Sequence, residues 1–86
     1  MTDRIEFVRS AAKVYARLDP TLQRRVDREL SRLHEAPRHP GVIRLQSNDE
    51  IYRVRIGDLR VLFGIEDQRL VVLILKIAQR GSAYRL

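Results

Sequence analysis

Arginine is the side chain through which this sequence could do chemistry, and three arginines flank the pair Gly57-Asp58: Arg53 and Arg55 before it, Arg60 after it. A two-residue loop with glycine first is typical of a type II′ β-turn, which fixes the register of the strands it joins. In that register Arg55 faces Arg60 and Arg53 faces Leu62, and the alternation of side chains puts all three arginines on one face. Opposed arginines repel unless an anion lies between them, so the pattern favours a phosphate site.

The C-terminal segment supplies a second candidate group. Lys76 follows an apolar run, and Arg80, Tyr84 and Arg85 come after it. An exposed tyrosine among arginines can stack on the bases of a nucleic acid. A tyrosine near the end of a chain can equally pack the tail onto the domain, and the sequence leaves both alternatives open. Alternating charge in the hairpin is likewise typical of ordinary solvated strands.

The composition favours a polyanionic partner. Of 17 basic residues fifteen are arginine, against 11 acidic residues, and the formal charge is +6 with a pI near 10.7. Arginine binds phosphate through a planar, bidentate fork and stacks on bases, which suits RNA contact or a protein interface, although a GC-rich genome would produce the same bias. The sequence contains no cysteine. A thiolate nucleophile, a thiolate metal ligand and a disulfide framework are therefore excluded.

The length bounds the organisation. At 86 residues, of which 44% are hydrophobic, we expect one small domain over residues 1–86, because two cores would not fit. No run of 18 apolar residues and no signal-peptide pattern is present. We therefore expect a soluble, cytoplasmic protein without a membrane partner.

The elements that must position the arginines follow from hydrophobic periodicity. Residues 4–8 alternate and predict a first strand, and a helix is expected over 11–18 with Ser10 as its N-cap. Asp19-Pro20 supplies the stop of this helix and the cap of a second one, which ends before Ala36-Pro37. The second helix carries one apolar stripe: Leu22, Val26, Leu30 and Leu33.

The rest of the chain predicts strands. A proline- and glycine-containing loop at 37–41 leads into a short strand near 42–45, and three strands follow at 51–56, 59–65 and 70–78 as an antiparallel meander. The last is apolar on both faces and should be central. The core face of the hairpin is Tyr52, Val54, Ile56, Leu59, Val61 and Phe63. The order βααββββ predicts a two-layer α+β fold: an N-terminal strand, a two-helix hairpin and the meander.

At this point the sequence resembles a family. The run from Tyr52 to Phe63, the apolar stretch 70–75, the segment from Lys76 to Arg80 and the pair Tyr84-Arg85 are similar to the C-terminal half of RelE/ParE-superfamily toxins. The first strand, the helical hairpin and the loop at 37–41 extend the similarity over nearly the whole chain. The resemblance implies a RelE-like fold and the toxin of a type II toxin–antitoxin system.

The resemblance also implies a reaction. RelE-type toxins are ribosome-dependent endoribonucleases in which the 2′-hydroxyl of mRNA attacks the neighbouring phosphate, without a metal or cofactor. By position, Arg53 and Arg55 correspond to the basic strand residues of the family, and Arg60 and Arg80 to those that contact the scissile phosphate. Tyr84 corresponds to the tyrosine that stacks on the substrate and can exchange a proton with it. The RNA-binding set implied is Arg53, Arg55, Arg60, Lys76, Arg80 and Arg85.

The sequence departs from the family's pattern at the groups that transfer protons. Gln79 stands where many relatives have histidine, and arginine is a poor base at positions where relatives carry lysine. We expect His34 and His39 to be surface residues. Tyr84 is then the best acid–base candidate.

Several functions stay open. Within the superfamily, the chain could be a ParE-like gyrase inhibitor or a catalytically degenerate toxin that acts by binding protein. Outside it, the sheet could be a general RNA-binding platform. The partners implied are a cognate antitoxin, the ribosome with mRNA, and operator DNA only through the antitoxin complex. Retained Arg60, Arg80 and Tyr84 favour the nuclease.

Overall fold

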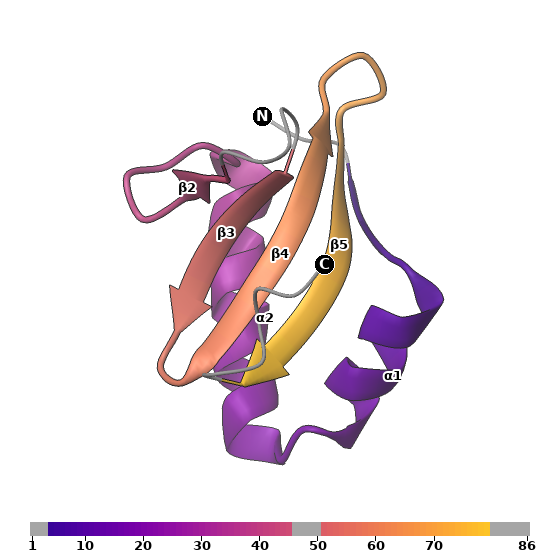
Figure 1. Ribbon diagram of the computed structural model, residues 1–86, viewed down its shortest axis with the longest axis vertical. Helices are drawn as coiled ribbons and strands as arrows, with labels where there is room; N and C mark the ends of the chain where they lie inside the picture. Colours follow the sequence, from indigo (N-terminus) through magenta and orange to yellow (C-terminus); the bar gives the residue numbers. More distant parts are fainter. Residues whose placement is uncertain (1–3, 46–50, 80–86) are drawn as a thin grey trace.

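The computed structural model describes residues 4–45 and 51–79, so the predicted tail residues Arg80, Tyr84 and Arg85 lie outside it. Five strands and two helices follow one another along these residues (Figure 1): β1 (Arg4–Phe7), α1 (Arg9–Arg17), α2 (Pro20–Glu35), β2 (Ile43–Arg44), β3 (Ile51–Ile56), β4 (Leu59–Glu66) and β5 (Val71–Gln79). The predicted order βααββββ is confirmed, with element ends shifted by one or two residues.

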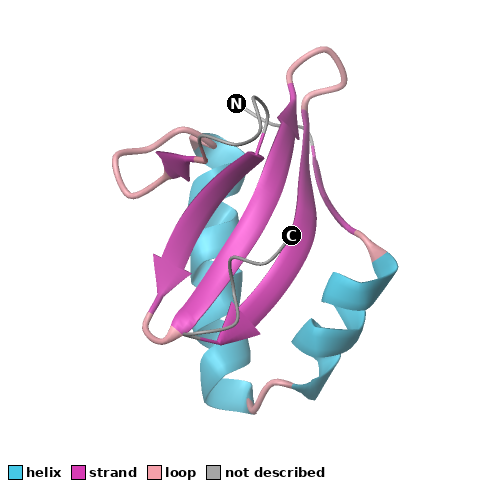
Figure 2. Cartoon of the chain, in the orientation of Figure 1, coloured by secondary structure: helices cyan, strands magenta, loops and turns pink. Residues whose placement is uncertain are grey.

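The strands form one mixed sheet in the order β1-β5-β4-β3-β2. β3, β4 and β5 are antiparallel neighbours, as predicted for the meander. β2 pairs antiparallel with β3, whereas β1 pairs with β5 in parallel. β5 therefore lies inside the sheet, which explains why it is apolar on both faces. Both helices lie on one side of the sheet, and no helix within the described residues covers the other side, here called the open face (Figure 2). The α+β fold is thus confirmed.

The core lies between the helices and the sheet. Val26 and Leu33 of the predicted α2 stripe are fully buried, and Phe63 of β4 is fully buried opposite them. Tyr52 stacks on Phe63 with ring centroids 5.8 Å apart. Because the hairpin residues predicted for the core face are all buried, the predicted face assignment is confirmed: Tyr52, Val54, Ile56, Leu59, Val61 and Phe63.

The β3–β4 hairpin has the predicted register. Arg55 pairs with Arg60 and Arg53 with Leu62, through to Tyr52 with Phe63. Gly57 has a φ of 58°, a left-handed value that a type II′ turn requires at its first central residue.

The helix starts show one correction. Asp19 caps α2 as predicted, accepting a hydrogen bond from the Leu22 N–H at 3.0 Å with Pro20 in the first turn. Ser10 does not cap α1; the N-cap is Val8, without a side-chain hydrogen bond. The Val8 N–H donates to the Ile74 carbonyl at 2.9 Å, so pairing with β5 continues to the residue at which the helix begins.

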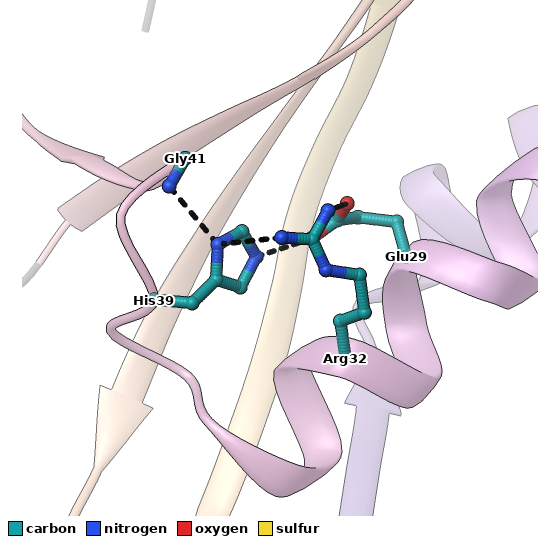
Figure 3. Close-up of polar contacts among 4 residues, drawn as sticks. All are labelled: Glu29, Arg32, His39 and Gly41. Atoms are coloured by element: carbon teal, nitrogen blue, oxygen red, sulfur yellow. Dashed lines mark hydrogen bonds and ion pairs between the residues drawn. The ribbon is translucent and has the colours of Figure 1, made fainter.

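A buried polar cluster joins α2 to the loop before β2 (Figure 3). His39 and Glu29 are only 9% and 7% exposed, and His39 Nε2 lies 2.6 Å from Glu29 Oε2. His39 Nδ1 accepts from the Gly41 N–H at 3.0 Å, which places the ring proton on Nε2. The expectation that both histidines are surface residues is therefore wrong for His39, because the loop folds it onto α2, whereas His34 is exposed.

Candidate nucleic-acid interface

The open face near the Gly57 turn carries the predicted cations in two cross-strand rows. Arg55, Arg60 and Ala78 form one row, and Arg53, Leu62 and Lys76 form the next. Acidic residues are absent from these six positions. The structure therefore brings together four of the predicted RNA-binding residues, here called the basic face: Arg53, Arg55, Arg60 and Lys76.

A β-bulge places Lys76 on this face. Between Leu62 and Phe63 the register of β4 against β5 shifts by one residue, so that Leu62 pairs with Lys76 but Phe63 pairs with Ile74. Without the shift, Lys76 would point toward the helices, since neighbouring side chains alternate. The sequence carries a signal for it: the buried residues Ile74 and Ile77 are spaced by three rather than two.

The four cations differ in exposure. Arg55 is exposed, while Arg53 and Lys76 are partly buried. Arg60 is only 7% exposed, and its Nη1 donates to the Leu59 carbonyl at 3.3 Å. The predicted face of Arg60 is confirmed, and its side chain is buried there. Arg55 is the most accessible anion-binding group of the basic face.

The opposite end of the open face, at the β4–β5 turn, has its charges paired. Glu66, expected in the turn, instead ends β4, and its Oε2 lies 2.7 Å from Arg69 Nη1. Arg69 also lies 3.9 Å from Glu6, which pairs with Arg4 at 3.6 Å. The same end holds a groove of about 740 Å³ whose lining includes Ile51, Leu73 and Leu75. This end is apolar and charge-neutralised rather than basic.

A bidentate ion pair closes the same end on the helix side. Both terminal nitrogens of Arg38 donate to Asp67 at 3.0 Å, and Arg38 Nε donates to the Tyr52 hydroxyl at 3.2 Å. The guanidinium of Arg38 lowers the pKa of Asp67, and the pKa of Arg38 is raised in turn. Arg38 thus links the loop after α2 to the β4–β5 turn.

Groups that transfer protons near pH 7 are missing from the basic face. Gln79 pairs with Leu59 and lines a hollow with Leu22, Arg25 and Asp58, on the α2 side of the sheet. His39 is buried beside Glu29. Within residues 4–45 and 51–79, no group of three or more histidines and carboxylates could hold a metal ion. The basic face can therefore bind and polarise a phosphate, and among the described residues it carries no histidine or carboxylate that could act as a general base.

The family described as "ParE toxin of type II toxin-antitoxin system, parDE" matches residues 5–84 of the chain. The chain belongs to the RelE/ParE superfamily of toxins. Its structure resembles that of the archaeal RelE–RelB complex from Pyrococcus horikoshii OT3, with 31% identity, a TM-score of 0.80, and coverage of 96% of this chain and 100% of that one.

Two further relatives extend the comparison. The isolated E. coli RelE toxin has a TM-score of 0.81 at 18% identity, covering 93% of this chain and 86% of that one, and so shares the fold. Toxin RelE1 of Methanocaldococcus jannaschii is 43% identical over 42 residues. That match spans 49% of this chain and 47% of the relative, about half the length of each. The superfamily predicted from the motifs is confirmed.

One finding bears on membranes. No helix among the described residues is long and apolar enough to span a bilayer.

Proposed function

We propose that this chain is the toxin of a type II toxin–antitoxin pair and a ribosome-dependent endoribonuclease that cuts mRNA. The observation that carries the proposal is the basic face: four cations in two adjacent cross-strand rows without an interposed carboxylate. Arg55 and Arg60 stand directly opposite each other, an arrangement that an anion between them stabilises. A bound phosphodiester is that anion.

In the proposed reaction the 2′-oxygen of one nucleotide bonds to the adjacent phosphorus and the bond to the 5′-oxygen breaks. The products are a 2′,3′-cyclic phosphate and a 5′-hydroxyl; the 2′-hydroxyl loses a proton and the 5′-oxygen gains one. Arg53, Arg55 and Arg60 stabilise the extra negative charge on the phosphate oxygens, and Lys76 contributes to RNA binding. Loss of one such electrostatic donor costs on the order of 10²–10³ in rate.

The burial of Arg60 limits how this side chain can contact a phosphate. With 7% of its surface exposed, Arg60 reaches a phosphate only when neighbouring side chains move. Arg55 therefore makes the first contact and Arg60 the later one. Proton transfer falls to Tyr84, and Arg80 and Arg85 add phosphate contacts; these three lie outside the described residues. Arginine stays protonated far above neutral pH, which leaves Arg53 and Arg55 to electrostatic roles.

The proposed partners are a cognate antitoxin, the ribosome and mRNA, with operator DNA bound only through the antitoxin complex and the cytoplasm as the place of action. The resemblance to the RelE–RelB complex of P. horikoshii supports the antitoxin. An arginine-rich toxin suits an acidic antitoxin segment that orders on binding.

A gyrase inhibitor is the second candidate, because the family that matches residues 5–84 is described as ParE. A degenerate toxin that acts by binding protein is the third, because Gln79 cannot exchange protons. A general RNA platform has less support, since Tyr52 and Phe63 stack inside the core rather than on the open face.

Primer extension in a purified translation system tests the proposal. We expect discrete cuts within codons that require ribosomes, and much slower cutting by Arg53→Ala than by Arg9→Ala, which removes an exposed arginine of α1. Tyr84→Phe separates stacking from proton transfer, and Arg80→Ala tests the second phosphate contact. Uncut mRNA together with inhibited gyrase supercoiling would establish the second candidate. Uncut mRNA with uninhibited gyrase and retained antitoxin binding would establish the degenerate toxin.

A further inference from the structure

A second cluster of arginines lies away from the basic face, where α2 passes the Gly57 turn. Arg25, Arg28 and Arg32 project from α2 at spacings of three and four, so they share one side of the helix. Together with Arg55 of β3 they line a pocket of about 300 Å³. We call it the arginine pocket; its lining is Arg25, Arg28, Glu29, Arg32, Arg55, Ile56 and Gly57.

The one carboxylate that lines this pocket, that of Glu29, is paired with Arg32 and His39. Glu29 Oε1 lies 3.3 Å from Arg32 Nη1, and its Oε2 lies 2.6 Å from His39 Nε2 (Figure 3). Arg32 Nη2 also lies 3.4 Å from His39 Nδ1. Glu29 therefore offsets the charge of Arg32 and is not free to offset the others.

No carboxylate of the described residues offsets the positive charges of the remaining three arginines. Among residues 4–45 and 51–79, no ion pair joins Arg25, Arg28 or Arg55 to a carboxylate. Asp58 borders the hollow on the other side of Arg25 without forming an ion pair with it. Three clustered guanidinium groups with one neutralised neighbour repel one another, and a bound anion removes that cost.

The turn itself holds one of the three in place. A Cβ atom on Gly57 would lie 2.9 Å from both terminal nitrogens of Arg25, so the guanidinium packs directly on the glycine backbone. Glycine at this position therefore has two roles: it adopts the positive φ of the turn, and it leaves room for the close approach of Arg25. Arg32 is fixed on the opposite side by Glu29 and His39. Two of the four arginines, Arg25 and Arg32, are therefore held by contacts on opposite sides of the pocket, and all four are exposed to solvent.

From this geometry we propose that the arginine pocket binds a phosphate of an RNA backbone, outside the face that carries the proposed cleavage. Arg55 belongs to both clusters, so the pocket continues the basic face around the edge of β3 toward α2. The inference rests on the proposed function in that it adds a second contact to the same RNA, either mRNA or ribosomal RNA. Planar guanidinium groups bind phosphate oxygens in bidentate fashion, and each such contact strengthens the salt dependence of binding.

The lining argues against a protein segment as the occupant. Protein interfaces rely on apolar or aromatic anchors in pockets, and the apolar side chain of this lining, Ile56, is only 7% exposed. The groove near Leu73 and Leu75, at the other end of the open face, suits a protein better. A phosphate of RNA binds through the positive charge of its site and does not require an apolar anchor.

The test compares Arg28→Ala and Arg25→Ala with Arg24→Ala, which removes the same charge from α2 outside the pocket. Affinity is measured against salt concentration in two arms: a fluorescent 30-nucleotide RNA, and vacant ribosomes with labelled toxin. Each pocket variant should lose about 3- to 10-fold in affinity and flatten the log–log salt slope by about 0.7–0.9, with Arg24→Ala closer to wild type. Arg28→Lys should recover part of the loss, which a purely structural role would not produce.

The two binding assays, with the RNA oligonucleotide and with ribosomes, distinguish the two sources of the phosphate. A loss confined to ribosomes assigns the phosphate to ribosomal RNA, and a loss confined to the oligonucleotide assigns it to mRNA; either supports the inference. Equal affinities and slopes for Arg28→Ala and Arg24→Ala in both arms overturn it, as does a loss of antitoxin binding with RNA binding intact. Pocket-dependent RNA binding without mRNA cleavage would leave the inference standing and remove the proposed function.

Discussion

At the β4–β5 turn, Arg38 and Arg69 each hold a carboxylate within 3.0 Å, whereas at the Gly57 turn Arg25, Arg28 and Arg55 have no carboxylate partner among the described residues. The residue type is the same at both ends, and the difference lies in what surrounds it. Paired arginines on a surface contribute little to stability and fasten loops in place. Clustered arginines without carboxylate partners produce a positive electrostatic potential that attracts an anionic ligand, and a nucleic-acid site requires such a potential.

β4 connects the two ends, and this explains how one sheet carries both. It begins at Leu59 beside the Gly57 turn and ends at Glu66 beside the paired charges. Its middle is buried on both faces: Phe63 toward the helices and Leu62 toward the open face, each 0% exposed. Because the sheet positions both ends, a substitution in the middle of β4 should impair both ends, and a substitution at one end should impair that end alone.

The largest effect is expected from Phe63→Ala, which removes the largest fully buried side chain. Such truncations cost about 3–5 kcal/mol, a large part of the stability of a domain this size. Urea unfolding should show the loss, and both ends should fail together because they share the strand. Phe63→Leu keeps most of the volume and should cost clearly less; equal losses would show that the site tolerates a cavity.

A smaller loss is expected from His39→Ala. The substitution leaves Glu29 Oε2 and the Gly41 N–H without their buried partner, which costs about 1–3 kcal/mol. His34→Ala is the matched control, since His34 is an exposed histidine in the last turn of α2 and should change stability by less than about 0.5 kcal/mol. Urea midpoints that fall equally for both variants would refute the structural role of His39.

Gly57→Ala should disturb stability and the arginine pocket together. A φ of 58° costs a residue with a side chain about 1–2 kcal/mol, and the added Cβ displaces Arg25. Arg25→Ala separates the two effects, because it removes the guanidinium that packs on Gly57 and leaves the glycine of the turn in place. The Arg25→Ala variant should keep wild-type stability in thermal unfolding yet still bind RNA weakly. Full RNA affinity in Arg25→Ala would show that the packing of Arg25 on Gly57 is irrelevant to binding.

The smallest effect belongs to the paired end, in Asp67→Asn. Arg38 lowers the pKa of Asp67, so the ion pair stabilises the fold above the pKa of unfolded aspartate, roughly 3.9, and the contribution disappears as pH falls through the lower folded value. The variant should therefore be slightly less stable than wild type at neutral pH, and the difference should vanish as the pH falls below the folded pKa of Asp67, where both the folded and the unfolded state are protonated. Urea midpoints over this range measure it. A difference that persists in acid would mean the carboxylate charge is not the cause.

Local patterns predicted what depends on neighbours in sequence. The α2 stripe, the cap at Asp19 and the β3–β4 register follow from spacing within a few residues, and all three are confirmed. The shared face of Arg53, Arg55 and Arg60 follows from that register. The family motifs add the tail residues Arg80 and Tyr84, whose roles stay predictions.

Features set by distant contacts were not predictable in the same way. The parallel pairing of β1 with β5 and the burial of His39 against Glu29 join segments that spacing does not relate. The arginine pocket was missed for the same reason, because Arg25 and Arg28 have the pattern of a solvated helix face. That face becomes a site only where α2 passes the Gly57 turn.

The central claim is that the Gly57 end works on RNA and the β4–β5 end does not. Arg55→Ala and Arg69→Ala test it as a matched pair, each removing one arginine from opposite ends of the molecule. The measurement is the rate of ribosome-dependent mRNA cleavage under single-turnover conditions. We predict a fall on the order of 10²-fold for Arg55→Ala and less than about twofold for Arg69→Ala. Equal losses, or a greater loss for Arg69→Ala, would contradict the assignment of the two ends.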